Sequence, residues 1–242
     1  MSEAVVNYPG KDLEAMSFAV KYHRWLLDEF RLFIGKHIVE VGAGKGSFSE
    51  MLLDLKPDSL AVIEPSEMFS DLTNNLSANT NGSEVLFFNS IFENAVSDIV
   101  SKERPDTIIY VNVLEHIEDD QRELTLIRDC LAERGRCLIF VPAMPLLLSE
   151  FDRDIGHFRR YRKPELEQKV RGAGFNILMS KYFDAAGIMP WFVKYRLLRS
   201  RTMGGSAVSI YDNLCVPVAR RLERLITPPI GKNIILAAEK RG

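Results

Sequence analysis

Short apolar runs alternate with amphipathic segments along most of the chain. Runs rich in β-branched and aromatic residues predict strands at about 37–41, 59–64, 84–88, 106–111 and 135–141. Between them, apolar residues recur at helical spacing, as in 48–55, 67–76 and 119–132. Buried strands that alternate with helices are typical of a parallel sheet with helices on both faces. Two further β-rich runs, 175–182 and 233–239, would complete that sheet.

Two other segments flank this alternation. Apolar residues at near-helical spacing before Gly35 predict an N-terminal helix within 11–35 that packs over the site at the first strand. Residues 185–230 do not continue the alternation of strand and helix patterns and contain two Pro-containing stretches and Gly204-Gly205. They predict a helical insertion before the last strand. Because the sequence shows no linker or internal repeat, we expect a single domain over 1–242.

Composition narrows the function classes. The 242 residues are 46% hydrophobic and 26% charged, which is typical of a globular chain, and the net charge of −2 predicts no general attraction to nucleic acid. Cys130, Cys137 and Cys215 are odd in number and form no C-x-x-C pair, which favours a reducing compartment. With no signal-peptide pattern and no uncharged stretch of membrane-spanning length, the expected location is the cytoplasm.

The strongest chemical signal is a glycine loop after the first predicted strand. Gly42, Gly44 and Gly46 let the backbone turn sharply and approach a ligand closely. A dinucleotide fingerprint would need glycine where Ser47 stands, and a Walker loop would need Ser or Thr directly after its lysine. Glu40 would repel a pyrophosphate, so it favours a ligand with a cationic or amine group. The alternative is a tight turn that binds nothing.

The spacing E-x-G-x-G-x-G resembles the first motif of class I S-adenosylmethionine (SAM) dependent methyltransferases. Glu64 ends the next apolar run, and 106–117 and 135–142 look like that family's fourth and fifth strands. Residues 22–26 and 156–161 are similar to a bacterial subgroup, of the methyltransferase type 11/12 kind, often associated with glycosyltransferases. The resemblance implies a Rossmann-like fold with a mostly parallel seven-stranded sheet, SAM as cofactor and S-adenosylhomocysteine as product.

The resemblance also implies roles for individual residues. Glu40 and the glycines would lie near the methionine part of SAM, and Glu64 would accept hydrogen bonds from the ribose hydroxyls. Asn89 and Ser90 occupy the place where many relatives carry an aspartate for the adenine amino group. The full expected cofactor set is Tyr22, Glu40, Gly42, Gly44, Gly46, Glu64, Pro65, Met68, Asn89, Ser90, Asn112 and Val113.

Methyl transfer mainly needs an aligned acceptor and, for some acceptors, a base that removes a proton. His116 follows the fourth strand and is a candidate base, or else an imidazole that caps a helix beginning near Ile117. In the loop after the fifth strand, His157 or Tyr161 would face the acceptor while Arg159 and Arg160 clamp its phosphate or carboxylate. The alternative is an ion-pair network with Asp152 and Asp154 that only orders the loop.

The insertion 185–230 carries seven basic residues against two acidic ones, together with apolar residues that include Trp191. It is either an amphipathic lid that contacts substrate or anionic lipid, or a helical cap with solvated charges. We expect Trp191 to contact substrate. No metal site is expected, because Glu115, His116, Asp119 and Asp120 lack the spacing of a ligand set.

These observations favour a SAM-dependent methyltransferase that acts on a small-molecule, glycan or lipid-linked acceptor, with peripheral membrane contact left open. The main alternative is a SAM-binding or protein-interaction module without catalysis. A nicotinamide oxidoreductase is disfavoured by Ser47 and Glu40.

Overall fold

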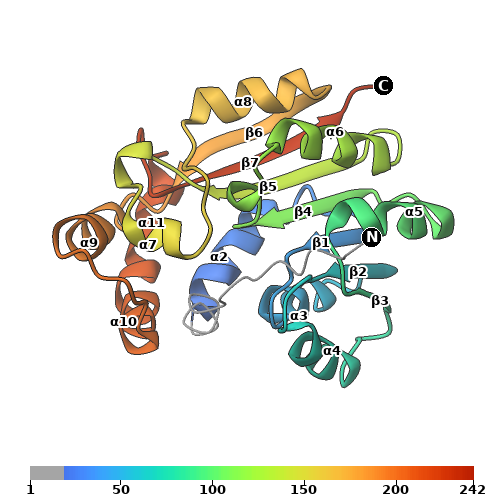
Figure 1. The fold of residues 1–242 in the computed structure, drawn as a ribbon, viewed down its shortest axis with the longest axis horizontal. Coiled ribbons are helices and arrows are strands. Elements are labelled where there is room, and N and C mark those ends of the chain that lie inside the picture. The colour runs from blue at the N-terminus through green and yellow to red at the C-terminus, as the bar shows by residue number, and fades with distance from the viewer. Residues whose placement is uncertain (1–18) are drawn as a thin grey trace.

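A seven-stranded sheet forms the centre of the molecule (Figure 1). The computed structural model describes residues 19–242, so the part of the expected first helix at 11–18 lies outside the described residues. The spatial order of the strands is β3-β2-β1-β4-β5-β7-β6. In chain order they are β1 (His37–Val41), β2 (Ser59–Ile63), β3 (Glu84–Phe88), β4 (Thr107–Val111), β5 (Arg136–Pro142), β6 (Phe175–Phe183) and β7 (Asn233–Lys240).

Strands β1 to β5 pair in parallel, whereas β7 runs antiparallel to both β5 and β6. Each predicted strand is present within about one residue of its expected ends. The predicted fold class, a mostly parallel seven-stranded sheet with helices on both faces, is confirmed. From β1 the sheet grows toward β3 on one side and, beginning with β4, toward β5 on the other. Ligands of open α/β sheets bind at the carboxyl ends of the strands where the strand order reverses in this way, here between β1 and β4.

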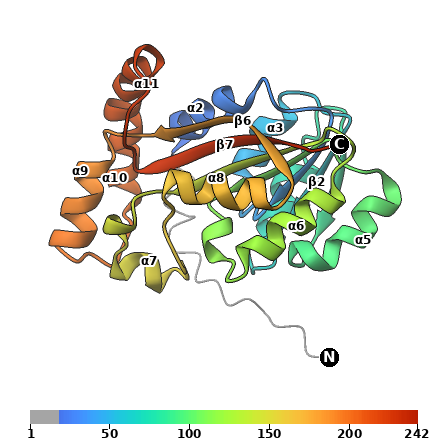
Figure 2. The same ribbon diagram turned by 90° about the horizontal axis from the view of Figure 1, so that it is seen from above.

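Helices cover both faces of the sheet and enclose two apolar layers (Figure 2). On β1, Val39 and Val41 enter one layer and Ile38 the other, as the period of two along a strand requires. The first layer is covered by α5 (Phe92–Lys102), α6 (Asp120–Cys130) and α8 (Lys163–Gly172). The second is covered by α2 (Val20–Phe30), α3 (Ser47–Leu53), α4 (Phe69–Ser77) and α11 (Val216–Leu225).

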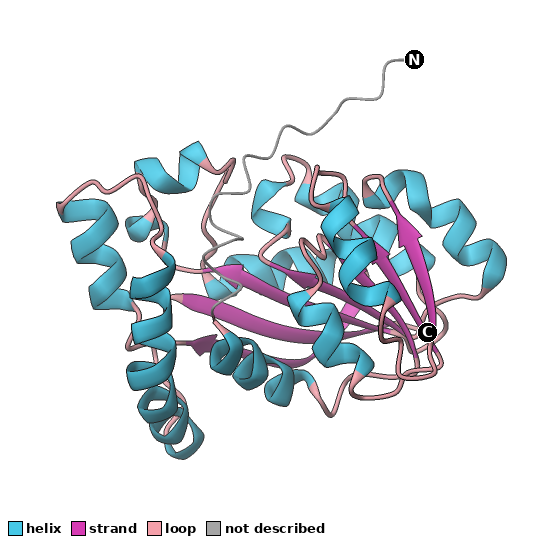
Figure 3. Cartoon of the chain, turned by 90° about the horizontal axis from the view of Figure 1, so that it is seen from below, coloured by secondary structure: helices cyan, strands magenta, loops and turns pink. Residues whose placement is uncertain are grey.

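The insertion between β6 and β7 is helical, as predicted, and lies at one end of the sheet (Figure 3). It contains α9 (Ile188–Trp191), α10 (Gly205–Ile210) and α11, with π-helical turns at Phe192–Leu197 and Tyr211–Cys215. Within residues 19–242, no helix combines the length and the apolar character needed to cross a membrane.

Polar contacts join the insertion to α2. The buried Asp212 carboxylate accepts hydrogen bonds from the N–H groups of Lys21 (3.0 Å) and Tyr22 (2.8 Å). These amides belong to the first turn of α2, where a helix leaves its N–H groups without intrahelical partners. Arg220 on α11 pairs with Asp28, which lies further along α2. The two elements are thereby held together although they are far apart in sequence.

Candidate active site

A cleft opens at the carboxyl ends of β1, β4 and β5 and encloses about 1030 Å³, its open mouth included. The glycine loop forms one wall, and the loop after β5 together with the insertion forms the other. Of the residues expected at the site, the cleft is lined by Tyr22, Glu40, Gly42, Gly44, Asn112, His157, Arg160 and Trp191.

The glycine loop has the backbone conformation that its composition predicts. Gly42 and Gly46 have φ of +72° and +90°, a region that residues with a Cβ rarely adopt. A Cβ on Gly42 would also lie 2.4 Å from Cγ2 of Val113, so this glycine allows β1 and the turn after β4 to pack closely. Val113 therefore supports the loop from beneath, whereas Gly46 begins α3 at its far end.

Glu40 lies on the cleft wall, with only 3% of its surface exposed. Its carboxyl group accepts a hydrogen bond of 2.5 Å from the Ser49 hydroxyl. Burial raises the pKa of Glu40 to about 8, and the nearby Glu64 adds to that rise against the opposing Ser49 hydrogen bond. A buried carboxyl group of this kind is poised to ionise when a cationic group binds beside it.

Glu64 follows β2 and holds the glycine loop directly. Its buried carboxylate accepts hydrogen bonds from the N–H groups of Gly44 (2.8 Å) and Ser66 (2.9 Å). The loop and the end of β2 are thus joined through one side chain. This clamp was not anticipated from the sequence, which suggested only a ribose contact for Glu64.

The other residues expected near the nucleoside lie at the same edge of the sheet. Pro65 and Met68 follow β2, and Asn89 and Ser90 follow β3. They lie outside the lining of the cleft, on the far side of the glycine loop from the loop after β5.

Asn112, directly after β4, has a left-handed backbone (φ 54°) and donates its N–H to Phe140 O at 2.8 Å. Such a conformation is uncommon outside glycine and is often found at functional sites. It brings this turn to the floor of the cleft between the glycine loop and β5.

Several polar lining residues were not expected at the site from the sequence, among them His23, Lys232 and Asn233. His23 is on α2, and Lys232 and Asn233 stand where β7 begins. Tyr22 donates its hydroxyl hydrogen to Oδ1 of Asn233 (3.1 Å), and Nζ of Lys232 lies 5.1 Å from the centre of the Tyr22 ring. Because β7 is antiparallel, its first residues reach the edge where the parallel strands end. An antiparallel direction of the last strand would therefore have indicated that Lys232 and Asn233 lie at the site.

The loop after β5 is organised around one buried carboxylate, Asp152. Arg160 donates to its Oδ1 through Nε (2.9 Å) and Nη2 (2.7 Å), and Nδ1 of His157 lies 3.1 Å from the same oxygen. Although burial raises its pKa, hydrogen bonds from His157 and Arg160 bring that of Asp152 down to about 2. Ser149 completes the arrangement as the N-cap of α7 (Glu150–Asp154).

Two expected roles in this loop are wrong in this geometry. Tyr161 is fully buried and its hydroxyl contacts Asp120 (2.9 Å) and Leu114 O (3.2 Å), so it does not face an acceptor in the cleft. Arg159 pairs with Asp120 (2.8 Å) and lies outside the cleft lining, so it cannot clamp an acceptor together with Arg160. Ion pairs do order this part of the loop, but the acid that Arg159 and Tyr161 contact is Asp120 at the start of α6, and neither Asp152 nor Asp154.

His116 ends a short 3-10 turn, Leu114–His116. It does not cap the helix expected near Ile117, because α6 begins at Asp120 and its N-cap is Asp119, which accepts from the N–H of Arg122. Burial lowers the pKa of His116 to about 3, with the nearby His157 lowering it further. The imidazole is therefore neutral at neutral pH, and its role as a base stays a prediction.

An aromatic stack joins the loop after β5 to the insertion. Phe151 and Tyr195 have ring centroids 4.6 Å apart, Trp191 and Tyr195 4.3 Å, and the Arg160 guanidinium lies 4.5 Å over the Trp191 ring. Beneath this stack lies a second, mainly apolar cavity under the insertion. It shares Tyr22, Trp191, Met203 and Lys232 with the cleft, so the two spaces are adjacent.

Comparison with solved structures shows the same fold. A SAM-dependent methyltransferase from Archaeoglobus fulgidus is 16% identical, with 91% of this chain and 93% of that chain covered and a TM-score of 0.58. The 1,6-didemethyltoxoflavin N1-methyltransferase of Burkholderia thailandensis, with S-adenosylhomocysteine bound, is 17% identical over 98% and 85%, with a TM-score of 0.59. The N-methyltransferase NodS of Bradyrhizobium japonicum is 13% identical over 93% and 87%, with a TM-score of 0.56.

Among curated proteins, a search found no match to this chain. The family described as "Methyltransferase domain" matches residues 19–180, which is more than half of the chain. The match begins at α2 and extends into β6, so it includes the glycine loop, Glu64 and the loop after β5. The chain belongs to the methyltransferase domain family and is a methyltransferase.

Proposed function

We propose that this protein transfers the methyl group of SAM to an acceptor bound between the glycine loop and the insertion. The observation that carries the proposal is Glu40, a buried carboxyl group on the cleft wall beside three glycines with positive φ. The amino group of the methionine part of SAM is the kind of cation that this carboxyl group favours. Solved proteins of the same fold contain S-adenosylhomocysteine, the product of such a reaction.

The acceptor we propose carries an apolar chain, as a lipid-linked glycan intermediate does. The cavity under the insertion supports this, because it is mainly apolar and adjoins the cleft through Tyr22, Trp191 and Met203. An acceptor headgroup in the cleft would leave room for its chain in that cavity. Trp191, at the boundary, would contact both parts, and Arg160 would support it from the cleft side. The resemblance to a subgroup associated with glycosyltransferases agrees with such an acceptor.

The outer face of the insertion supports action at a membrane surface. Along α10, the π-turn and α11, one stripe of exposed apolar residues recurs every three or four positions: Ile210, Leu214, Val218, Leu222, Leu225 and Ile226. Arg221 and Arg224 are exposed on the same helix. An amphipathic helix with apolar and basic residues is suited to the interface of an anionic lipid layer. We name this set the α11 stripe.

The cofactor assignment is tested by titration calorimetry with SAM. Glu40→Gln keeps the size of the side chain but removes its charge, so SAM affinity should fall by about 10- to 100-fold, as for a lost charge-assisted hydrogen bond. Glu50→Gln, on the exposed face of α3, is the matched control and should bind as the wild type does. Equal affinity in all three proteins would place the methionine amino group elsewhere.

Catalysis is tested separately with radioactive SAM and a bacterial lipid extract. Transfer of label into the lipid phase would support a lipid-linked acceptor, and transfer into the aqueous phase would support a polar one. If SAM binds tightly and no label moves to any fraction, the alternative of a cofactor-binding module without catalysis is the better description.

A further inference from the structure

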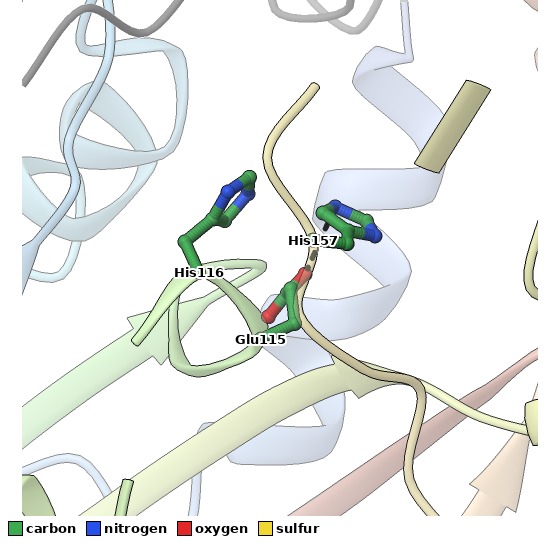
Figure 4. A group of neighbouring side chains, drawn as sticks. All are labelled: Glu115, His116 and His157. Atoms are coloured by element: carbon green, nitrogen blue, oxygen red, sulfur yellow. Dashed lines mark ion pairs between the residues drawn. The ribbon is translucent and has the colours of Figure 1, made fainter. Parts of the chain in front are cut away.

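Two loops bring together one carboxylate and two imidazoles at the acceptor end of the cleft (Figure 4). Glu115 and His116 belong to the 3-10 turn after β4, and His157 belongs to the loop after β5. One ligand-type atom from each lies within 4.8 Å of the others. His157 was expected to face the acceptor and lies 41 positions beyond His116, so the spacing around His116 alone did not indicate a metal site.

The geometry of His157 presents a lone pair to this cluster. Its Nδ1 lies 3.1 Å from Asp152, an ionised carboxylate that is also bound by Arg160, so Nδ1 is the nitrogen that carries the hydrogen. The other nitrogen, Nε2, faces Glu115 and lies 3.8 Å from its Oε1. Nε2 is thus the nitrogen of His157 that points into the cluster.

The surroundings of the cluster match those of metal-binding histidines. A histidine that ligates a metal commonly donates its other N–H to a carboxylate, which fixes the ring and the tautomer. Asp152 holds His157 in this way, and His116 forms a hydrogen bond with the backbone of Gly156 in the same loop. Gly156 has φ +88°, and a Cβ there would lie 3.4 Å from Nδ1 of His116, so the loop backbone passes close to that ring.

We propose that Glu115, His116 and His157 bind one divalent transition-metal ion. Two imidazoles and one carboxylate suit ions such as Mn²⁺, Co²⁺ or Zn²⁺ better than Mg²⁺, which prefers oxygen ligands. Ligand atoms about 2 Å from a common ion lie ~3 Å apart, so small side-chain rotations would close the cluster around it. The Glu115 side chain is fully buried, and an ion beside it would compensate the charge that burial disfavours.

The position of the cluster in the cleft indicates a role for the ion in the reaction. This role rests on the proposed methyl transfer. Glu115 and His157 line the cleft together with Asn112 and Pro142. An ion there would contact the acceptor and lower the pKa of a hydroxyl group on it. The O–H bond then breaks and the proton leaves to solvent, while the oxygen attacks the methyl carbon and the C–S bond of SAM breaks. The products are a methyl ether, S-adenosylhomocysteine and a proton, so the acceptor class is an alcohol or phenol.

The test measures metal binding directly. The full-length protein is stripped with a chelator, dialysed and titrated with Mn²⁺, followed by electron paramagnetic resonance, and with Co²⁺, followed by visible absorption. We expect one ion per chain in the wild type and at least about tenfold weaker binding in Glu115→Gln and His157→Asn. His37→Asn is the matched control, because His37 also lies beside acidic groups, Asp58 and Glu103, but outside the cleft.

Folding is checked by thermal unfolding and SAM affinity in each variant. If Glu115→Gln does not fold, His116→Ala takes its place, because His116 is only partly buried. Unchanged Mn²⁺ binding in the folded variants, or no binding in the wild type, overturns the proposal. Metal binding without SAM binding would overturn the proposed function and leave the ion site standing, whereas SAM binding without metal binding would do the reverse.

Discussion

At the scale of single residues, two carboxyl groups beside the glycine loop have opposite tasks. Glu64 is held by two backbone N–H groups and keeps the loop against β2. Glu40 has one hydroxyl partner and a pKa raised to about 8 by burial, so it is the group that can respond to a bound cation. Both side chains are nearly fully buried, so it is their hydrogen-bond partners that differ.

The raised pKa of Glu40 predicts a pH-dependent stability of the protein without SAM. The folded state binds a proton at Glu40 more tightly than the unfolded chain, whose ordinary pKa is 4.5, so stability should fall as pH rises from 4.5 to about 8 and level off above. Each pKa unit corresponds to ~1.4 kcal/mol. Glu40→Gln should match the wild type near pH 5 and exceed it near pH 9 in urea unfolding. Parallel curves for the two proteins would show that Glu40 ionises normally.

The clamp by Glu64 predicts a double effect of one substitution. Glu64→Ala should weaken SAM binding by on the order of 1.5–3 kcal/mol and also lower stability without SAM by about 1–3 kcal/mol, because two buried N–H groups lose their acceptor. Calorimetry and urea unfolding measure the two effects. Glu67→Ala, exposed in the same loop, should change neither. A loss of stability with unchanged SAM affinity would mean that the ribose does not contact Glu64.

At the scale of elements, the loop after β5 is a hydrogen-bonded unit rather than a row of open donors. Its buried hub is Asp152, and its second anchor is Asp120 at the start of α6, which Arg159, Tyr161 and Lys169 contact. The loop therefore holds its shape before an acceptor arrives, with His157 and Arg160 already on the cleft wall.

This arrangement predicts unequal effects of the two neighbouring arginines. Arg160→Ala leaves Asp152 buried without its main ion-pair partner and should destabilise the protein by about 3–5 kcal/mol. Arg159→Ala should cost about 1 kcal/mol or less, because Asp120 keeps Lys169. Urea unfolding of each single variant gives the comparison. If Arg160→Ala instead kept full stability and raised only the acceptor KM, Arg160 would be the anion-binding residue expected from the sequence.

At the scale of the whole molecule, the insertion has an inner apolar cavity and an outer apolar stripe. Fewer of its basic side chains are free to contact lipid than the sequence count suggests, because several already have partners within the protein. Arg196 donates to Leu148 O, Arg201 pairs with Glu150 and Asp154, and Arg220 pairs with Asp28. The α11 stripe with Arg221 and Arg224 is therefore the surface on which a lipid interaction is best tested.

The α11 stripe predicts binding to phosphatidylglycerol vesicles. Burying a leucine contributes about 1.5–3 kcal/mol, so Leu222→Ser with Leu225→Ser should reduce the vesicle partition coefficient by at least about tenfold. Arg221→Gln with Arg224→Gln should reduce it at low salt and flatten its salt dependence. Leu178→Ser, an exposed position on β6, serves as the control in the sedimentation assay. No sedimentation of the wild type at low salt would reject membrane contact.

Features that depend on local sequence patterns could be predicted, whereas contacts between residues far apart in the sequence could not. Strand and helix positions follow from local periodicity, and the carboxyl ends of β1, β2 and β4 follow from the strand pattern, so Glu40, Glu64 and Asn112 could be found. The meeting of Asp152 and His157 with the turn at Glu115 depends on how two loops fold over the sheet. The roles of Tyr161 and Arg159 failed for the same reason, because their partner Asp120 is 39 or more positions away.

The ends of the insertion have a consequence for how acceptor choice can change. Phe183 and Asn233 are paired across β6 and β7, the N–H of Lys232 donates to Asp184 O at 3.1 Å, and Gly231 packs directly against the Phe183 backbone. The chain thus leaves the sheet and returns to it at one point, like a long hairpin loop. Length and composition can vary between these two points without a shift in strand register. Variation confined to 185–230 could therefore exchange one acceptor for another while the glycine loop and its carboxyl groups stay as they are.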